Sequence, residues 1–110
     1  EAAERSMLEA IELDPGNSYY HVGLAFVYAW NDRREDTLAI LEQAEEKNFS
    51  LVEIGLVYGV LGDMDLAFEY MYRALEDSPA ALYYIAADPS ADPMRKDPRW
   101  TEFLNALEPL

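Results

Sequence analysis

Cysteine is missing from this sequence of 110 residues. Its absence excludes disulfides, thiolate zinc sites and cysteine nucleophiles, and it fits a reducing compartment, so we expect a cytoplasmic protein. The chain also lacks an apolar run near the roughly 20 residues of a membrane-spanning helix. The sequence also lacks a basic start followed by a hydrophobic segment, which is the pattern of a signal peptide. A membrane is therefore not an expected partner.

Basic residues are scarce. The chain carries 8 lysines and arginines against 22 aspartates and glutamates, which gives a formal net charge of -14. A surface of this charge repels nucleic acid and anionic membranes, and it attracts basic segments of other proteins. We therefore expect a protein or peptide segment as the partner, apolar or partly basic, and no nucleic acid.

Groups typical of catalysis are also scarce. The chain has one histidine, His21, so a catalytic pair of histidines is excluded. We expect His21 to pack beside the preceding turn. The chain has no glycine-rich phosphate loop and no nucleophile elbow. Its grouped aspartates lack the spacing of a calcium loop, and helix capping explains them; they are Asp63, Asp65, Asp88, Asp92 and Asp97. We expect no enzyme activity, no cofactor and no metal.

Apolar residues make up 51% of the chain, which excludes a disordered protein. A length of 110 residues predicts a single domain over residues 1–110. The chain opens on Glu1 inside a helical pattern. We therefore expect it to be a fragment of a longer protein.

Helical periodicity is the main structural signal. Apolar residues at i, i+4, i+7 and i+8 predict an amphipathic helix over residues 1–13. A turn follows, in which Gly16 is expected to supply a left-handed residue. Asn17 is then expected to cap a second helix over residues 18–31.

Three further helices follow from local signals. Asp32 and Glu35 form a capping-box pattern that opens a third helix, to about Lys47. A second capping box opens a fourth helix over residues 51–61, and a Gly-Asp turn leads to a fifth over residues 64–77.

The sequence repeats itself at these helices. Three sets of residues stand at spacings of 34 and then 30: Ala3, Thr37 and Ala67; Met7, Leu41 and Met71; Ala10, Ala44 and Ala74. Tyr28 and Tyr58 repeat the spacing of 30. The shorter spacing indicates a deletion of one helical turn near residues 47–50. Since one helix pair cannot bury its apolar face alone, the pairs are expected to stack.

The second pair resembles the tetratricopeptide repeat, a motif of two antiparallel helices. The matching residues are Gly55, Tyr58, Gly62, Ala67, Ala74 and Pro79 in the second pair, and the departures are His21, Ala25, Thr37 and Phe49 in the first repeat. The resemblance implies an all-α fold, an α-α superhelix or TPR-like solenoid. Its segments would be the second helix of a preceding repeat (1–15), repeat one (18–47), repeat two (48–79) and a tail with a capping helix (80–110).

Three Asp-Pro pairs mark the tail, and each can start a helix, because aspartate caps and proline needs no donor at the first helical position. Similar tails close the tetratricopeptide regions of multidomain bacterial regulators, including nucleotide cyclases, protein kinases and winged-helix regulators. The matching residues are Arg95, Asp97, Pro98, Arg99, Trp100 and Leu104, and Ala91 departs. The resemblance implies a capping helix over about 98–107, with Trp100, Phe103, Leu104 and Leu107 turned inward.

The resemblance also places a partner groove, because the first helix of each pair lines the concave face in this family. The implied groove residues are Tyr19, Val22, Phe26, Trp30, Val52, Glu53, Leu56 and Val60. Phe26 and Trp30 would be its anchors, and an apolar groove favours a hydrophobic helix. The same stripe is also typical of plain core packing, and that interpretation stays open.

Two functions follow from the resemblance. The first is a protein-protein interaction scaffold, expected as a C-terminal regulatory region of a larger bacterial signalling or transcription regulator. The alternative is a structural or oligomerisation module whose groove is filled by its own tail or by a second copy, which would form a homodimer.

Overall fold

The computed structural model describes residues 2–43, 49–77, 82, 85 and 88–107, and these residues form helices and turns without any strand. The predicted all-α class is therefore confirmed, while the TPR-like superhelix stays a prediction. The chain divides into two compact units, unit 1 (Glu1–Ser50) and unit 2 (Leu51–Leu110).

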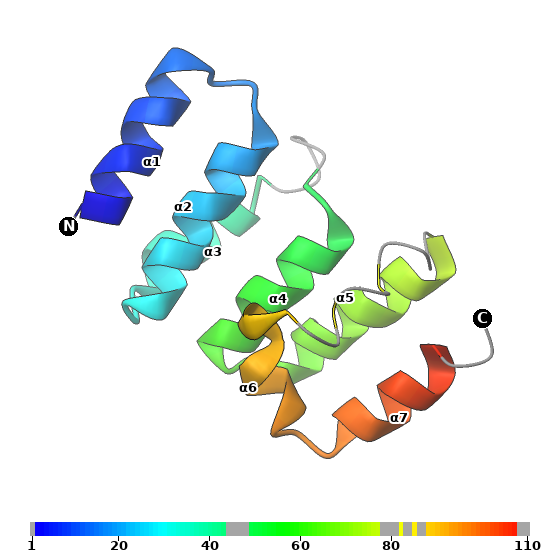
Figure 1. The fold of residues 1–110 in the computed structure, drawn as a ribbon. Helices are drawn as coiled ribbons and strands as arrows, with labels where there is room; N and C mark the ends of the chain where they lie inside the picture. The colour runs from blue at the N-terminus through cyan, green and yellow to red at the C-terminus, as the bar shows by residue number, and fades with distance from the viewer. Residues whose placement is uncertain (1, 44–48, 78–81, 83–84, 86–87, 108–110) are drawn as a thin grey trace. The chain divides into compact units, whose positions relative to one another are not determined.

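The described residues of unit 1 form three helices, and the middle helix contacts both of the others (Figure 1). They are α1 (Ala2–Leu13), α2 (Ser18–Trp30) and α3 (Arg34–Leu41). The Asn17 side chain accepts a hydrogen bond from the Tyr19 amide at 2.9 Å, so Asn17 caps α2 as predicted. α2 is the apolar centre of the unit, with buried Val22, Leu24, Ala25, Phe26 and Ala29, whereas α1 has no buried residue.

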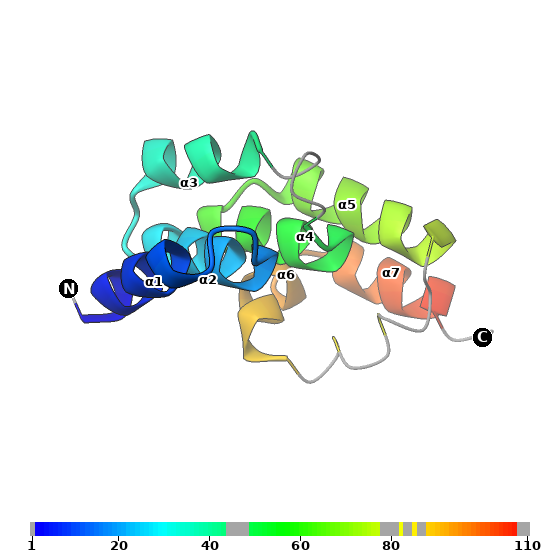
Figure 2. The same cartoon turned by 90° about the horizontal axis from the view of Figure 1, so that it is seen from above.

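Unit 2 is built on an antiparallel helix pair, α4 (Leu51–Leu61) and α5 (Met64–Asp77), seen side by side in Figures 1 and 2. The tail adds a 3-10 helix, η3 (Pro89–Ala91), then α6 (Asp92–Arg95) and α7 (Arg99–Leu107). The expected inward residues of α7 are buried at Trp100, Phe103 and Leu107 and half-buried at Leu104. The predicted end of repeat two at Pro79 lies outside the described residues.

Two of the three Asp-Pro pairs cap helices as predicted. The Asp88 carboxylate accepts from the Ser90 amide at the start of η3, and the Asp97 carboxylate accepts from the Arg99 amide at the start of α7, both at 2.9 Å. The prediction is wrong at Asp92, which lies inside α6 and pairs with Arg95. A capping residue needs non-helical backbone, and Asp92 already has helical angles (φ -51°, ψ -45°) because it follows directly on η3.

The turn after the first helix of each pair is the same in both units. In each turn, one backbone amide donates a hydrogen bond to a tyrosine carbonyl. The amide of the preceding residue donates to the carbonyl of the residue after that tyrosine, and the two bonds together form the pattern of a Schellman motif. The N···O distances are 2.9 Å for Arg33 to Tyr28, 3.1 Å for Asp32 to Ala29, 3.0 Å for Asp63 to Tyr58 and 3.1 Å for Gly62 to Gly59. The backbone therefore repeats at the spacing of 30 that Tyr28 and Tyr58 predicted.

This motif corrects the prediction for Asp32. Among the described residues, positive φ occurs at Asp32 (58°) and Gly62 (89°) only. Asp32 therefore closes α2 instead of capping α3, whose N-cap is Arg33 without a side-chain hydrogen bond. α3 ends at Leu41 in the described residues, and its predicted end at Lys47 lies outside them.

The prediction of a left-handed residue at Gly16 is also wrong, because the φ angle of Gly16 is not positive. The Asn17 amide donates to the Asp14 carbonyl at 3.1 Å, which closes a four-residue turn. Turns of this size form with negative φ at both central residues, so the position does not require a left-handed residue.

The repeated turn predicts opposite effects for two exchanged residues. Asp32→Gly should raise the free energy of unfolding by about 0.5 kcal/mol, because glycine adopts positive φ without the cost that a Cβ carries. Gly62→Asp should lower it by about 1 kcal/mol for the same reason. Urea denaturation followed by circular dichroism measures both changes. Shifts of the same sign would show that the two turns are not equivalent.

Candidate functional site

The four groove residues predicted in unit 1 lie on one face of α2. Tyr19, Val22, Phe26 and Trp30 are spaced by three, four and four residues, which is the period of one helix face. Tyr19 and Trp30, at the two ends, are 73% and 61% exposed. Val22 and Phe26, between them, are buried at 8% each. The face therefore presents two aromatic side chains to solvent with apolar residues buried between them.

Both exposed rings rest on a neighbouring ring. The Trp30 and Phe26 rings stack, with centroids 5.2 Å apart and planes at 27°. Tyr19 packs edge-on against Tyr20 at 5.9 Å. Such contacts limit the conformations of an exposed side chain, so less entropy is lost when a partner covers it.

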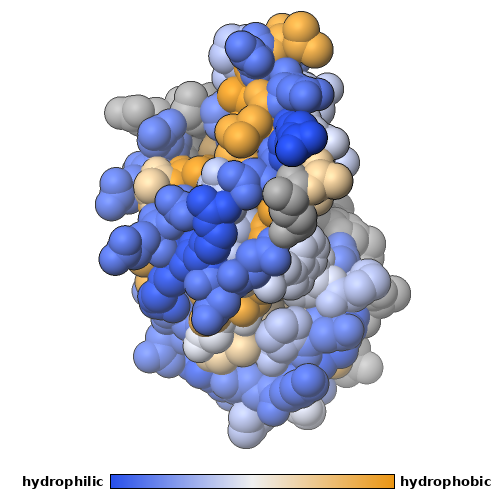
Figure 3. Space-filling model, turned by 90° about the vertical axis from the view of Figure 1, so that its left-hand side faces the viewer, coloured by the Kyte–Doolittle hydropathy of each residue, from blue (hydrophilic) through white to orange (hydrophobic). Residues whose placement is uncertain are grey.

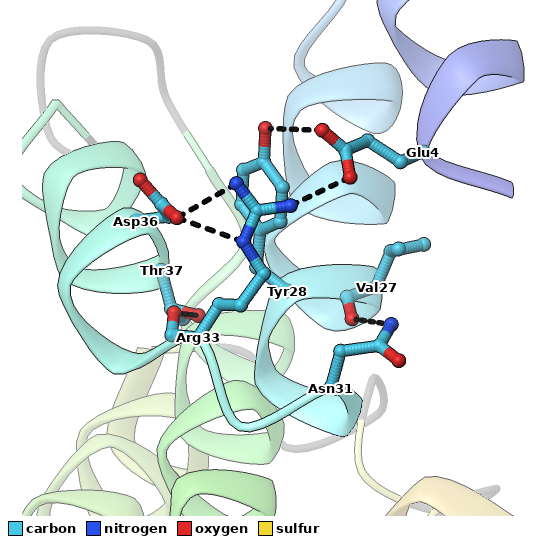
Figure 4. Close-up of polar contacts among 7 residues, drawn as sticks. All are labelled: Glu4, Val27, Tyr28, Asn31, Arg33, Asp36 and Thr37. Atoms are coloured by element: carbon cyan, nitrogen blue, oxygen red, sulfur yellow. Dashed lines mark hydrogen bonds and ion pairs between the residues drawn. The ribbon is translucent and has the colours of Figure 1, made fainter. Parts of the chain in front are cut away.

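A polar cluster holds the turn that follows Trp30 (Figure 4). The Arg33 guanidinium donates to Glu4 of α1 at 2.6 Å and to Asp36 of α3 at 2.9 Å. It also lies 4.2 Å from the centroid of the Tyr28 ring, whose hydroxyl donates to Glu4 at 3.4 Å. One arginine therefore connects side chains of α1, α2 and α3.

The charges of this cluster add orientation more than stability. The Arg33 and Glu4 side chains are 42% and 23% exposed, and ion pairs at that exposure contribute about 0 to 1 kcal/mol. Partial burial raises the pKa of the Tyr28 hydroxyl, and the nearby Glu4 carboxylate raises it further. Tyr28 therefore stays protonated and keeps its hydrogen bond to Glu4 at neutral pH.

Sequence reasoning missed this cluster, because Glu4 and Arg33 are 29 residues apart. A signal was present in the repeat. At spacings of 34 and 30, Glu4 corresponds to Leu38 and Phe68, so a charged residue stands where the other two helices have apolar ones. A charge at a repeated apolar position indicates a polar contact that the other copies lack.

The groove residues predicted in unit 2 lie on α4. Val52 and Leu56 are buried, at 2% and 1% exposure, whereas Glu53 and Val60 are half-buried. The apolar members therefore serve the packing of the unit, and Glu53 is the member with an ionisable group. The predicted groove as a whole stays a prediction.

Glu53 carries a carboxylate in an environment that disfavours its negative charge. Burial raises the pKa of its carboxyl group, and the negative charge of Asp88 raises it further. The residue lies in the first turn of α4, where the helix dipole favours a negative charge, yet the net direction is upward. A cation beside Glu53 would therefore relieve a cost that the isolated chain bears.

Replacing Glu53 with glutamine should stabilise unit 2 at neutral pH. A carboxyl group with a raised pKa contributes most to stability when protonated, and that contribution is lost as the pH rises through the folded-state pKa. Glutamine mimics the protonated form, so Glu53→Gln should gain less than about 1 kcal/mol at pH 7, after allowance for solvent screening, and nothing near pH 3. Exposed Glu69 on α5 provides the matched control, Glu69→Gln. Equal gains in both variants would assign the effect to net charge.

His21 has the structural setting that the sequence predicted. Its Nε2 lies 3.0 Å from the Pro15 carbonyl of the preceding turn, and its ring stacks on Phe49 at 6.2 Å. Within the described residues, no three histidine, cysteine, aspartate or glutamate side chains come together as a metal site. None of the helices in these residues combines the length and apolar character that a membrane span requires.

Comparisons of the chain with protein-family models, with curated proteins and with solved structures gave no match.

Proposed function

We propose that this chain is a protein-binding scaffold of TPR-like helix pairs, and that the aromatic face of α2 is part of its partner surface. The observation that carries the proposal is the exposure of Tyr19 and Trp30 on one helix face, each supported by a second ring. Exposed large aromatics that are held in place are typical binding anchors.

The partner would be a segment that carries both apolar and basic side chains. Its apolar residues would cover Trp30 and Tyr19, which removes aromatic surface from water. Its lysines or arginines would be attracted by the net charge of -14, which speeds encounter more than it adds affinity. The resemblance of the tail extends the proposal to the parent protein, a larger bacterial signalling or transcription regulator of which this chain is a C-terminal, cytoplasmic regulatory region.

Trp30 itself can report binding. In a Trp100→Phe background it is the only tryptophan, and burial of its ring shifts its emission to the blue. The probe is an 18-residue helical peptide with leucines on one face and lysines on the other. The control is a peptide of the same composition with the leucines scattered. We expect saturable binding of the amphipathic peptide only, weakened at least about tenfold by Tyr19→Ala in this assay. Trp30→Ala should weaken it by a similar factor when binding is followed through a fluorescent label on the peptide.

Circular dichroism separates a binding role from a packing role. If the alanine variants keep the helical signal and bind as tightly as the parent chain, the proposed surface is wrong. If they lose the helical signal, these rings belong to the core.

A second function, self-association, is favoured by one observation. The exposed large apolar side chains of the described residues all lie in unit 1: Leu8, Leu13, Tyr19 and Trp30. A second copy could cover them. Sedimentation velocity over a hundredfold range of concentration tests this alternative, which requires a dimer whose formation shields Trp30 from a soluble quencher.

A further inference from the structure

Methionine side chains pack against glycines at three helix contacts. A Cβ placed at Gly23 of α2 would lie 2.8 Å from the Met7 sulfur of α1. Met71 and Met94 fill the same kind of space at two glycines of α4. The unbranched, flexible thioether adapts to such gaps. The missing side chain at Gly23 therefore lets α1 approach α2 through the Met7 sulfur.

Exposure separates Met7 from the other two methionines of these contacts. Met71 and Met94 are fully buried, at 0% exposure, whereas Met7 is half-buried. α1 has no buried residue, and Leu8, next to Met7, is 45% exposed. Figure 3 faces the side of the molecule on which α1 lies and shows hydrophobic surface among the hydrophilic residues there. A small solute can therefore reach Met7 more easily than Met71 or Met94.

Met7 contacts α2 on the side that carries the exposed aromatic rings. Gly23 stands four residues after Tyr19 and seven before Trp30, and residues at these spacings share one side of a helix. The Met7 sulfur therefore lies beside the aromatic face of α2. Methionine is also typical of surfaces that bind apolar segments, because its side chain is flexible and polarisable.

Oxidation would convert this apolar group into a polar one. Hydrogen peroxide transfers one oxygen atom to a thioether: a sulfur lone pair attacks the peroxide, the S–O bond forms as the O–O bond breaks, and water leaves. The sulfur is oxidised by two electrons and the peroxide is reduced. The product is methionine sulfoxide, a polar and chiral side chain.

The sulfoxide oxygen has no favourable position at Met7. The side toward Gly23 has no space for it, because only the missing Cβ of glycine lets the sulfur approach α2 so closely. On the open side, the oxygen would place a polar group beside the aromatic face, where a partner that covers it would have to remove its water. One epimer of the sulfoxide therefore disturbs the contact of α1 with α2, and the other makes the partner surface less apolar.

We propose that Met7 is an oxidation site that regulates the partner surface of α2. The thioether holds α1 against α2, and the sulfoxide loosens α1 and lowers the affinity for a partner. The regulation of binding rests on the proposed function, whereas the loosening of α1 does not. Met71 and Met94 are shielded from the same oxidant, so the response begins in unit 1.

Mild treatment of the full chain with hydrogen peroxide tests the proposal, with each methionine followed by mass spectrometry of peptides. Met7 should be oxidised at least about tenfold faster than Met71 and Met94. Amide hydrogen exchange in α1 should then become at least about fivefold faster. The fluorescently labelled amphipathic peptide should bind at least about tenfold more weakly. Methionine sulfoxide reductases for both epimers, with a thiol reductant, should reverse these changes.

Met7→Leu is the matched control, because leucine has a similar volume and is not oxidised by peroxide. This variant keeps Trp30 and half-buried Met64, so peroxide should change neither its exchange nor its binding. Met7→Gln, which imitates the polar sulfoxide, should reproduce both changes without peroxide.

The outcomes separate this proposal from the proposed function. Equal responses of the parent chain and Met7→Leu overturn the proposal, and so does an oxidised parent chain whose α1 exchanges at an unchanged rate. Faster exchange with unchanged peptide binding overturns the regulation. If the untreated chain does not bind the peptide at all, the proposed function is wrong, and the exchange of α1 still decides whether Met7 is an oxidation-sensitive contact.

Discussion

Phe103→Ala should lower the free energy of unfolding of unit 2 by about 3 to 5 kcal/mol. Phe103 is fully buried, and its ring contacts those of Phe68 at 6.4 Å, Tyr72 at 5.3 Å and Trp100 at 5.9 Å. Alanine would leave a cavity between α5 and α7 that these three rigid rings cannot fill.

An ion pair also attaches α7 to α5, but it is much weaker than the aromatic cluster around Phe103. Arg99 donates to Asp65 of α5 at 2.7 Å, but the two side chains are 41% and 93% exposed, so the pair is worth about 1 kcal/mol or less. Asp65→Ala should therefore cost far less than Phe103→Ala.

Trp100 provides the measurement. In a Trp30→Phe background, its fluorescence against urea follows unit 2 alone. Phe103→Leu, which keeps most of the volume, should retain most of the stability. A larger loss from Asp65→Ala than from Phe103→Ala would mean that the ion pair, and not the ring cluster, attaches α7.

Most helix limits could be predicted from the sequence. The predicted ranges 51–61 and 64–77 coincide with α4 and α5, and the ranges 1–13, 18–31 and 98–107 differ from α1, α2 and α7 by one residue at one end. These limits depend on local signals, namely apolar periodicity, capping side chains and helix-breaking turns.

Asp32 shows where local reading failed. A capping-box pattern and a left-handed closing residue both place an aspartate between two helices, and the pattern alone does not separate them. The internal repeat does, because Asp32 aligns with Gly62, a residue type that is typical of positive φ. The alignment of the two repeats therefore identifies the role of Asp32, which the capping-box pattern alone does not.

The candidate site could be predicted only in part. Periodicity correctly gathers Tyr19, Val22, Phe26 and Trp30 on one face of α2, but it does not say which neighbours cover that face. The ends of the stripe are open and its middle is buried. Burial depends on packing between segments that are distant in sequence, and the ion pair of Glu4 with Arg33 does too. The period of a single helix carries no information about such contacts.

Gly55→Leu should destabilise unit 2 by about 1 to 3 kcal/mol through overpacking. Even a Cβ at this position would lie 2.8 Å from the Met71 Cε and 3.0 Å from the Ala67 carbonyl. The Met71 methyl can move, but the carbonyl belongs to the backbone of α5 and cannot. A leucine would therefore push the two helices apart at this position.

Gly55→Ala should be nearly neutral, since two effects oppose each other. Alanine gains about 1 kcal/mol over glycine inside a helix, and the tight contact with the Ala67 carbonyl removes a similar amount. The repeat supports this balance, because Ala25 stands at the same register position of α2 and is fully buried.

The matched control is Gly16→Leu, at a glycine with open space around its Cβ position. This change should stay within about 0.5 kcal/mol of the parent chain. Urea midpoints followed by circular dichroism, which reports the helices of both units, compare the three variants. If Gly55→Leu costs no more than Gly16→Leu, then α4 and α5 do not approach closely at Gly55, and a small residue at this register position is not what brings the two helices together.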